Sequence, residues 1–594
     1  MSSPTLRKAR RLAAASLRPP MKLRLSQWAE QNIRLPAGTA VPGPLRLYAY
    51  QRGIADAITD PQYEKVSILK SARIGYSMLL SVAIANFVVN DPANVLSVFP
   101  TDEAASRFVV SDLEPMFAAS PSLRNAFHAD KSRKSRNRIL AKRFPGGELR
   151  AVSAIPRHLD AHTSRIVIAD EADRMEPTIE GSPLALAEKR TLTFRNRKIL
   201  VGSTPRFTQT SFVIAAYNES DRRVYEVPCP GCGDHCEIEW KDIKWPPGEP
   251  HKAFWCTPCC GTVVEEDQKL DLVEKGRWRS TRPEVIGHAG FKVNALISPL
   301  PQATWAKIAT EFLRCGKDPT LLQAFFNTII GEGWDAAQGE GVDETALFNS
   351  REGFGLDAIP EDVLAIVCGV DVQHDRLEVT LVGYDRHGVA YVLAHQIIYG
   401  RWDDNETWAD LDALLKTRWK HPLGGSIGVD AACVDSSDGT TMDRVYDFCF
   451  PRYRRKVMAI KGRAGNVPWI VAHAQRKRAG TLWQVGVDGI KGALFERLKA
   501  GGFYRFSEDL DLEFFEQLNG ERLVEKRKMG VKVLEFVPVA GRRHEVLDCV
   551  VYAMAAHKTL NINWDQRASE LRQEPQATPR PRVIESDWIK GMTG

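Results

Sequence analysis

The stretch Ile68–Leu80, ILKSARIGYSMLL, has the pattern of a short apolar strand, a turn with one glycine, and the beginning of an apolar helix. A phosphate-binding loop belongs at such a junction, but the usual pattern G-x-x-x-x-G-K-[ST] is incomplete here. Gly75 and Ser77 stand in their expected places, whereas Lys70 takes the place of the first glycine and Tyr76 that of the lysine. The stretch indicates either a phosphate-binding loop whose lysine has moved or an ordinary strand–turn–helix.

Short apolar runs alternate with helical patterns around this stretch, from Leu47 to about Arg223. Such alternation predicts an α/β domain with a parallel, doubly wound sheet. The expected strands are Val66–Leu69, Val95–Phe99, Leu149–Val152, Ile166–Ala169 and Lys198–Gly202.

Two of the expected strands end in polar residues suited to nucleotide hydrolysis. The apolar run of RIVIADEADRM ends in Asp170 and Glu171, an arrangement in which one carboxylate holds the Mg²⁺ shell and the second orients the attacking water. KILVGSTP ends in Ser203 and Thr204, which we expect to sense the γ-phosphate. An acidic helix cap would explain Asp170 and Glu171 alone, but the ordered set of three strand ends favours a P-loop (RecA/ASCE-like) ATPase domain.

Lys70 fits such a site, because its ammonium can reach the β- and γ-phosphates of ATP from the start of the loop. The backbone N–H groups of the loop and the helix N-terminus supply the rest of the anion cradle. Ser77 is expected to ligate Mg²⁺, and Arg73 is expected to lie against the transferring phosphate. Upstream, Tyr50 and Gln51 are placed to meet the adenine ring by stacking and amide hydrogen bonding.

Three aspartates in the C-terminal half stand where an RNase H-like nuclease needs carboxylates. Asp371 lies in an apolar strand, Asp435 ends another strand, and Asp548 lies on a late amphipathic helix. Two Mg²⁺ or Mn²⁺ ions roughly 4 Å apart need several anionic oxygens to activate water and stabilise the leaving oxygen. A single strand aspartate is more often a turn or edge residue, but three on these elements indicate a metal-dependent nuclease. Supporting roles are considered for Asp375, Asp430, Asp438 and Glu545.

Two C-x-x-C pairs, separated by 23 residues, predict a structural zinc ribbon. Proline and glycine beside the pairs favour the tight turns that point two sulfurs at one Zn²⁺. Four thiolates make a closed site, which is structural rather than catalytic. The expected ligands are Cys229, Cys232, Cys256 and Cys259, with Cys236, Cys260, His235 and His251 as spare ligands if one of the four is replaced.

The length of 594 residues exceeds what one core can organise, and about three to four domains are expected. Hydrophobic content of 44% and charged content of 26% are typical of a soluble globular protein, and no apolar run approaches the ~20 residues of a membrane span. The N-terminus lacks the apolar core of a secretory signal, so we expect a cytosolic protein whose eleven cysteines are metal ligands or core thiols. Basic blocks at 1–29 and 131–143, each with seven Lys or Arg and no acid, are either solvated faces or contacts with a polyanion.

These patterns together predict the organisation of the chain. A Gly-rich acidic stretch is expected to be a linker, and the C-terminal residues are expected to form a mobile tail. The expected segments are a basic N-terminal arm (1–45), the P-loop ATPase domain (46–225), the zinc ribbon (226–265), a connecting segment (266–335), the linker (336–360), the RNase H-like nuclease domain (361–560) and the tail (561–594).

The ordered set of motifs resembles the bacteriophage terminase large subunit of the lambda GpA type. The resemblance covers about residues 25–560. It implies a DNA-packaging motor, in which an N-terminal ATPase drives double-stranded DNA through the portal into an empty capsid and a C-terminal nuclease cuts the concatemer into genome units. It rests on KSARIGYS, IADEAD, VGSTP, the paired cysteine knuckles, GVDVQHDRLE, VDSSDG, AIKGR (Ala459–Arg463) and HEVLDCVVYA.

The same resemblance implies residue roles and partners. Ser203 and Thr204 match the motif that couples hydrolysis to movement. The N-terminal arm would meet the small terminase subunit and the tail the portal protein, with a homo-oligomer forming during packaging in the host cytoplasm. One departure matters: lambda-like members can carry a second lysine just after the loop's serine, where this chain has Met78. Lys70 is then expected to supply the positive charge at the phosphates, with Arg73 in support.

Two other functions are compatible with parts of the pattern. The letters DEAD at 170–173 also occur in helicases, so a helicase–nuclease acting on DNA in repair or defence is an alternative. Such an enzyme needs a second motor domain, and no stretch like Q-x-x-G-R-x-x-R follows residue 350. A DNA-binding scaffold with decayed sites is disfavoured, because the acidic residues of both sites are intact.

Overall fold

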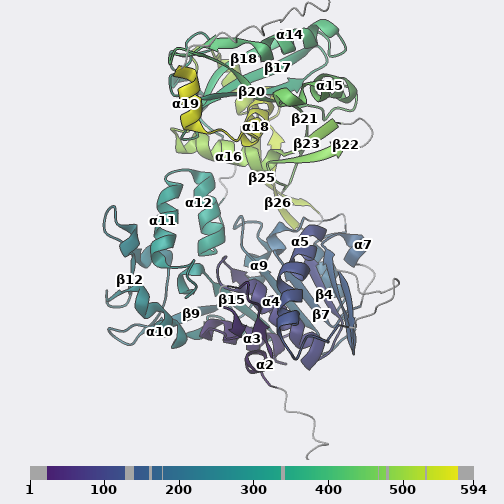
Figure 1. Cartoon of the computed structure of the whole chain (residues 1–594), viewed down its shortest axis with the longest axis vertical. Helices are drawn as coiled ribbons and strands as arrows, with labels where there is room; N and C mark the ends of the chain where they lie inside the picture. Colours follow the sequence, from purple (N-terminus) through teal and green to yellow (C-terminus); the bar gives the residue numbers. More distant parts are fainter. Residues whose placement is uncertain are drawn as a thin grey trace, which may run out of the picture. The chain divides into compact units, whose positions relative to one another are not determined.

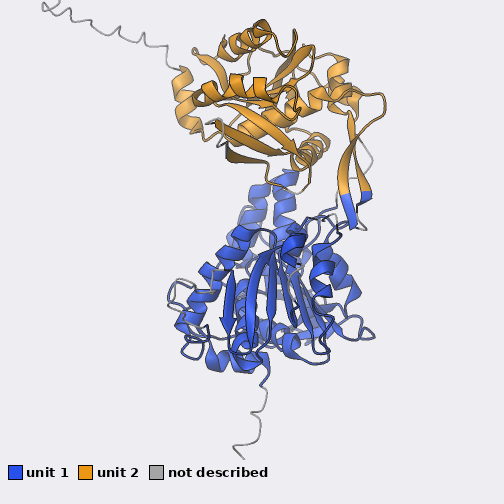
Figure 2. Ribbon diagram, turned by 90° about the vertical axis from the view of Figure 1, so that its right-hand side faces the viewer, with its two compact units in different colours: residues 1–336, 526–533 blue, residues 337–525, 534–594 orange. Residues whose placement is uncertain are grey.

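The computed structural model describes residues 23–39, 41–127, 140–159, 163–176, 178, 180–335, 341–465, 467–475, 480–528 and 531–572. The chain forms two compact units, which Figure 2 shows in different colours: unit 1 is Met1–Ala336 with Lys526–Val533, and unit 2 is Ala337–Glu525 with Leu534–Gly594. Parts of the predicted N-terminal arm, basic block at 131–143, linker and tail lie outside the described residues.

Unit 1 is organised around a ten-stranded sheet in the order β10-β9-β15-β3-β8-β7-β4-β6-β5, with β14 paired on β9 (Figure 1). Neighbouring strands from β9 to β6 are parallel, which confirms the predicted parallel α/β sheet. All five expected strands are present. The strands are β3 (Lys65–Lys70), β4 (Val95–Phe99), β5 (Ala141–Phe144), β6 (Gly147–Ser153), β7 (Ile166–Asp170), β8 (Lys198–Ser203), β9 (Arg223–Pro228), β10 (His235–Glu237), β14 (Arg277–Ser280) and β15 (His288–Val293).

One strand of this sheet comes from the segment that was expected only to connect two domains. β15 lies between β9 and β3, and it pairs with β3 from His288 opposite Lys65 to Val293 opposite Lys70. Residues 266–335 therefore complete the sheet beside the phosphate-loop strand. Polar residues interrupt the short run HAGFKV, and for this reason the strand is not evident in the sequence.

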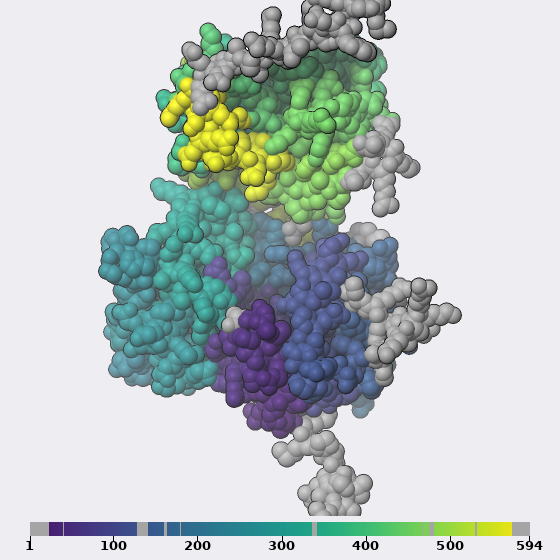
Figure 3. Space-filling model, in the orientation of Figure 1, coloured from purple at the N-terminus to yellow at the C-terminus, as the bar shows by residue number. Residues whose placement is uncertain are grey.

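Helices cover both faces of the sheet, because its strands are apolar on both sides. In β7, Ile166 and Ile168 belong to one core with α3 and α4, whereas Val167 and Ala169 belong to a second core with α7 and α8. In the space-filling view, the purple atoms of the N-terminal part of the chain, which includes α2 and α3, gather on one face of unit 1 (Figure 3), and these two helices pack against each other. The helices are α2 (Leu25–Asn32), α3 (Ala49–Thr59), α4 (Tyr76–Ala85), α5 (Asp102–Phe108), α6 (Glu114–Ala119), α7 (Pro156–Leu159), α8 (Pro183–Lys189), α9 (Phe212–Glu219), α10 (Lys269–Glu274), α11 (Trp305–Cys315) and α12 (Pro319–Phe325).

Unit 2 is built on a nine-stranded sheet in the order β22-β23-β21-β20-β16-β17-β18-β24, with β19 paired on β20. β16, β17 and β18 form an antiparallel meander, and β20 and β21 continue the sheet in parallel with β16. This mixed sheet confirms the RNase H-like fold predicted for the C-terminal half. The strands are β16 (Ala365–Val372), β17 (Arg376–Tyr384), β18 (Ala390–Tyr399), β19 (Arg418–Lys420), β20 (Ser426–Asp435), β21 (Val457–Arg463), β22 (Ile470–Gln475), β23 (Gly480–Gly486) and β24 (Tyr504–Phe506). A separate pair, β25 (Glu521–Lys528) and β26 (Val531–Pro538), belongs partly to each unit, because Lys526–Val533 is assigned to unit 1.

Helices also cover both faces of the unit 2 sheet. α16, α17 and α18 share a core with Val367 of β16, and α14, α15 and α19 share a second core with Ile366 on the other face. α18 is buried because it packs against β16, β17 and β20. α13 and α19 form within the segments expected to be linker and tail. The helices are α13 (Glu344–Asn349), α14 (Asn405–Lys416), α15 (Met442–Cys449), α16 (Val487–Ala500), α17 (Leu512–Leu518), α18 (Glu545–Lys558) and α19 (Trp564–Arg572).

Short strands account for the rest of the regular structure. β11 (Ile243–Lys244), β12 (Phe254–Cys256) and β13 (Val263–Val264) form a small sheet between and after the two cysteine pairs. β1 (Arg34–Leu35) and β2 (Gly43–Pro44) pair near the start of unit 1. Within the described ranges, no helix combines the length and the apolar character needed to cross a bilayer.

Candidate nucleotide, zinc and nuclease sites

The carboxyl ends of β3, β8 and β7 meet at one edge of the unit 1 sheet and bring the predicted nucleotide-site residues together. The parallel register places Asp170 of β7 opposite Gly202 of β8. Lys70, at the end of β3, is 5% exposed, and its Nζ lies 2.8 Å from Oε1 of Glu171 and 3.9 Å from Oδ1 of Asp170. The displaced lysine of the phosphate loop therefore reaches the acidic pair at the end of β7.

The environment shifts the pKa values of the two carboxyls of this pair in opposite directions. Burial raises the pKa of Asp170 to about 6, although the Lys70 ammonium partly offsets this effect. Burial would also raise the pKa of Glu171, but the charge of Lys70 and its hydrogen bond outweigh burial and lower this pKa. Glu171 is therefore an ionised carboxylate at neutral pH, and Lys70 covers one of its oxygens.

The residues that follow β8 contact the same carboxylate. Thr204 Oγ1 donates to Oε2 of Glu171 at 3.5 Å. Ser203 is fully buried, and its Oγ accepts the backbone N–H of Asp173 at 3.2 Å. Ser203 and Thr204 thus connect the end of β8 to the residues that follow β7.

Tyr50 and Gln51 support the phosphate loop. Both side chains donate to the carbonyl oxygen of Ile74, Tyr50 from its hydroxyl at 3.0 Å and Gln51 from Nε2 at 2.9 Å. Tyr50 is 0% exposed and Gln51 is 2% exposed. The expected contact of these residues with an adenine ring is therefore corrected, because a buried ring and an amide already bound to the loop do not offer a face to a ligand.

The turn of the loop depends on two residues with left-handed backbone, Arg73 (φ 66°) and Gly75 (φ 78°). Nη2 of Arg73 lies 2.7 Å from Oε2 of Glu311 on α11, so this guanidinium is held by a carboxylate. Its expected place against the transferring phosphate stays a prediction and requires Arg73 to leave Glu311. Ser77 is exposed on the first turn of α4.

Tyr76, in the usual lysine position, packs against the sheet. It is 5% exposed, and Nζ of Lys70 lies 4.6 Å from the centroid of its ring, within the range of a cation–π interaction. A Cβ on Gly202 would overlap the Tyr76 hydroxyl, so the glycine admits the ring. The hydroxyl has no hydrogen-bond partner among the described residues, and burial raises its pKa well above the ordinary value. The ring packs beside Lys70, whereas the hydroxyl makes no hydrogen bond to the described residues.

Tyr76→Phe is expected to hydrolyse ATP as fast as the wild type and to be at least as stable, because the substitution removes a buried hydroxyl that makes no hydrogen bond. Tyr76→Ala removes the ring beside Lys70 and should lower the free energy of unfolding by about 3 kcal/mol or more. Phosphate release and thermal melting measure the two effects. A Tyr76→Phe variant that melts normally but hydrolyses ATP far more slowly would give the hydroxyl a catalytic role.

Four cysteine sulfurs gather in the predicted zinc ribbon. The Sγ atoms of Cys229, Cys232, Cys259 and Cys260 all lie within 4.8 Å of one another. The Cys229–Cys260 and Cys232–Cys259 separations are 3.4 Å and 3.3 Å. Tetrahedral zinc bonded to sulfur at about 2.3 Å places its ligands about 3.8 Å apart, so this donor set fits Zn²⁺. Burial would raise the pKa of Cys229, but hydrogen bonds, the largest from Thr257, lower it to about 5, which favours the thiolate that zinc binds.

The expected ligand set is corrected at one position, because Cys260 joins the cluster and Cys256 does not. In the first knuckle the backbone N–H of Gly233 donates a hydrogen bond to the carbonyl of Cys229. In the second knuckle the equivalent bond runs from the N–H of Gly261 to the carbonyl of Thr257. Thr257 therefore takes the place of a first cysteine, and the second turn lies one residue later than the C-x-x-C spacing indicates.

Cys260→Ser is expected to lower the zinc content of the purified protein, and Cys256→Ser is expected to leave it unchanged. A serine at a ligand position replaces a soft thiolate with a hydroxyl that binds zinc far more weakly. Elemental analysis of the folded protein after dialysis against a weak chelator measures the difference. Zinc loss in Cys256→Ser with full retention in Cys260→Ser would restore the original ligand set.

The predicted nuclease carboxylates converge where β16 and β20 end. Val370 pairs with Val434 in parallel, so Asp371 and Asp435 follow side by side on adjacent strands. Asp548 lies on the first turn of α18, which packs on β16. Burial raises the pKa of Asp371 to about 7 and that of Asp435 to about 6, and the charge of Asp548 adds to both shifts. One buried carboxylate, Asp371, and two half-buried ones, Asp435 and Asp548, repel one another and fit a site for divalent cations.

Hydrogen bonds fix the orientation of two of these carboxylates. Gln373 Nε2 donates to Oδ2 of Asp371 at 2.6 Å. Ser437 Oγ donates to Oδ1 of Asp435 at 2.7 Å and accepts the backbone N–H of Gly462 at 3.1 Å. The AIKGR motif, which contains Gly462, thus supports Asp435 through Ser437.

The two halves of the chain match two models of one protein family. Residues 39–278 match the model described as phage terminase large subunit gpA, ATPase domain. Residues 288–569 match the model described as terminase large subunit gpA, endonuclease domain. The chain belongs to the large-subunit family of phage terminases. It is an ATPase and an endonuclease of phage DNA packaging.

Known terminases are similar over nearly the whole length of the chain. The terminase large subunit of Enterobacteria phage P21 is 28% identical over 620 residues, which cover 97% of this chain and 96% of that protein. The terminase large subunit of Escherichia phage lambda is 26% identical over 614 residues, which cover 96% and 95%. Among solved structures, the large terminase of a thermophilic bacteriophage is 13% identical, with a TM-score of 0.46 over 86% of this chain and 98% of that chain.

The terminase nuclease unit holds a further buried carboxylate that was not predicted. Glu378 lies opposite Asp371 on β17 and is 0% exposed. Arg376 and Arg543 bind one of its oxygens, and Nε2 of His395 lies 3.5 Å from the other. Burial would raise the pKa of Glu378, but His395 and the two arginines lower it, so this carboxylate is neutralised by its own partners. The sequence signal for this carboxylate is the alternation of polar and apolar residues in RLEVTL, which places Glu378 within a strand.

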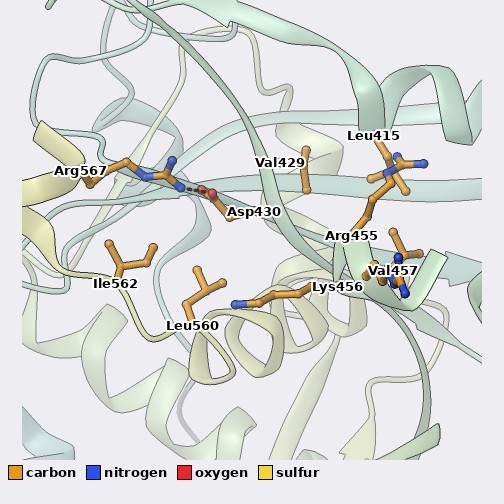
Figure 4. A pocket seen from close by; sticks show the side chains of 10 residues that line it. Leu415, Val429, Asp430, Arg455, Lys456, Val457, Leu560, Ile562 and Arg567 are labelled. Atoms are coloured by element: carbon orange, nitrogen blue, oxygen red, sulfur yellow. Dashed lines mark hydrogen bonds and ion pairs between the residues drawn. The ribbon is translucent and has the colours of Figure 1, made fainter. Parts of the chain in front are cut away.

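Asp430, considered above as a supporting carboxylate, does not belong to the nuclease cluster. It faces a cavity of about 350 Å³ that lies at the beginning of β21 (Figure 4). Asp435, in contrast, ends β20. Asp430 forms an ion pair with Arg567 and accepts the backbone N–H of Ile366 at 3.1 Å. These contacts assign Asp430 to the attachment of α19.

Proposed function

We propose that this terminase large subunit uses ATP hydrolysis to drive double-stranded DNA into a procapsid and cuts the concatemer into genome units. The proposal is carried by the presence, in one chain, of a phosphate loop whose Lys70 lies 2.8 Å from Glu171 and of a separate cluster of three aspartates. The helicase–nuclease considered above finds no support in the family to which the chain belongs.

The nucleotide site suggests a role for each of its side chains. Ser77 and Asp170 would hold Mg²⁺. The ion would supply positive charge beside the phosphates, and ATP supplies the bond that is hydrolysed. Lys70 leaves Glu171 for the β- and γ-phosphates, where its charge stabilises the leaving oxygens. Glu171, uncovered by that movement, orients the attacking water. Thr204, which donates to Glu171, transmits the change to the loop after β8.

The nuclease site suggests a similar division of roles. Asp371, Asp435 and Asp548 would hold two Mg²⁺ or Mn²⁺ ions, which activate water and offset the charge of the leaving oxygen. Gln373 and Ser437 keep oxygens of the first two aspartates oriented. Because the pKa of Asp371 is raised to about 7, cations that bind at neutral pH displace a proton from the site.

Family membership supports the remaining parts of the proposal. The four clustered cysteines would hold Zn²⁺ as a structural ion in the ribbon. The proposed partners are double-stranded DNA, the small terminase subunit and the portal protein of the procapsid. We place the active form, a homo-oligomer, in the host cytoplasm.

ATP-dependent packaging into purified procapsids tests this function. The large subunit is mixed with the small subunit, procapsids, concatemeric DNA, ATP and Mg²⁺, and DNA protected from an added nuclease is measured. We expect protected DNA of genome length. Unwinding of a short duplex by the chain alone, with no protected DNA, would instead support the helicase–nuclease.

A further inference from the structure

A lysine lies among the carboxylates of the proposed nuclease centre. Lys491, on α16, is 6% exposed, and its Nζ lies 3.0 Å from Oδ1 of Asp548 and 2.9 Å from Oε1 of Glu521. Glu521, the first residue of β25, is also 6% exposed. The ammonium therefore joins α16, β25 and α18 at the point where α18 carries a proposed metal ligand.

The buried position of this lysine is costly, because desolvation of an ammonium opposes its charge. Two carboxylates compensate this cost, because the Lys491 ammonium lies within 3.0 Å of an oxygen of Asp548 and within 2.9 Å of an oxygen of Glu521. Lys499, eight residues later on the same helix, is exposed to solvent, in contrast to Lys491. Lys491 is thus a fixed cation beside a cluster that is otherwise anionic.

The contact engages one of the two oxygens of Asp548. Oδ1 is bound by Lys491, whereas Oδ2 lies 3.9 Å from Nε2 of His544. We propose that Lys491 is a positioning residue of the nuclease: anchored on Glu521, it holds Oδ1 of Asp548 and leaves Oδ2 to ligate the divalent ion. This inference rests on the proposed function, in which Asp548 is a metal ligand.

A positioning role and a structural role predict different measurements. Groups that orient a metal ligand typically change metal affinity or activity by about 10- to 100-fold. Without Lys491, the Asp548 carboxylate can rotate, and the misplaced ligand slows the reaction. The same change removes a positive charge that repels cations, so metal binding is retained or strengthened. A merely structural lysine would lower activity and metal binding together.

Lys491→Met in the full-length chain tests the proposal, because methionine keeps much of the side-chain length without its charge. Nicking of supercoiled plasmid at saturating Mn²⁺ is expected to fall about 10- to 100-fold. The Mn²⁺ dissociation constant, measured by calorimetry without DNA, should stay the same or decrease, and ATP hydrolysis should be unchanged. Lys491→Arg, which keeps a cation, should recover part of the nicking rate. Lys499→Met is the matched control on the same helix and should behave as the wild type in all three assays.

Wild-type nicking by Lys491→Met would overturn the proposal, and so would a joint loss of nicking and Mn²⁺ binding in a folded variant. If Lys491→Met does not fold, Glu521→Gln must show the same split, slower nicking with retained Mn²⁺ binding, or the proposal fails. Absence of Mn²⁺-dependent nicking by the wild-type chain would overturn the proposed nuclease function itself. Normal nicking by Lys491→Met alone would overturn this inference and leave that function standing.

Discussion

Lys70→Ala is expected to slow ATP hydrolysis by about 100-fold or more, while metal-dependent nicking of DNA continues at its normal rate. The substitution removes the ammonium that lies 2.8 Å from Glu171 at the edge of the unit 1 sheet. Neighbouring residues do not readily replace it, because Arg73 is bound to Glu311 and the residue after Ser77 is the uncharged Met78. Phosphate release measures the first activity, and nicking of supercoiled plasmid with Mn²⁺ measures the second.

Lys65→Ala is the matched control for this experiment. Lys65 lies at the other end of β3 and forms an ion pair with Glu188 at 2.6 Å, so its loss should leave hydrolysis near the wild-type rate. Normal hydrolysis by Lys70→Ala would remove the phosphate-loop assignment. Loss of nicking together with hydrolysis would mean that the substitution acts on the fold and not on the site.

Much of the nucleotide site could be predicted because its residues follow buried strands directly. Asp170 and Ser203 each end an apolar run, and a parallel sheet brings such ends to one edge. The partner of Arg73 could not be predicted, since Glu311 is 238 residues away on α11. Tyr50 shows a second limit: an aromatic residue beside a glutamine looks the same in sequence whether it faces a ligand or the loop that holds the ligand.

The zinc ribbon shows that cysteine spacing predicts a site better than it predicts each ligand. The two knuckles were evident from the pattern, but the second turn is closed by Gly261 onto Thr257. That turn selects Cys260 over Cys256. The choice between Cys256 and Cys260 depends on backbone hydrogen bonds, which the spacing alone does not contain.

In the nuclease site, too, residues marked by their own strand or helix could be predicted, whereas a residue defined by tertiary contacts could not. Asp371, Asp435 and Asp548 could be proposed because each stands at a recognisable place on a strand or helix. Lys491 could not be proposed, because VDGIKGALFERLKA gives no sign that one lysine is buried and another exposed. Its two partners come from β25 and α18, and tertiary packing alone brings them to α16.

Gly369→Ala is expected to disable the nuclease by about 100-fold, even though residue 369 is not one of its ligands. A Cβ at Gly369 would overlap the carbonyl oxygen of Cys549 and lie 2.7 Å from the backbone nitrogen of Ala553. Both atoms belong to the backbone of α18, so no side-chain rotation relieves the clash and the helix must move away from β16. Asp548 precedes Cys549 and would move with it, and a displacement of about 1 Å can cost about 100-fold in rate. The overpacking should also lower the free energy of unfolding by about 1–3 kcal/mol.

Gly492→Ala separates this effect from a general effect of replacing glycine in unit 2. A Cβ at Gly492, in the middle of α16, would meet no atom within 4 Å. The control should therefore nick DNA normally and be more stable by up to about 1 kcal/mol, because alanine favours a helix over glycine. Plasmid nicking at saturating Mn²⁺ and urea denaturation measure both variants, with ATP hydrolysis as the internal reference for unit 1. If Gly369→Ala nicks DNA at the wild-type rate, close packing of α18 on β16 is not what places Asp548 beside Asp371, and the three-aspartate centre loses its structural basis.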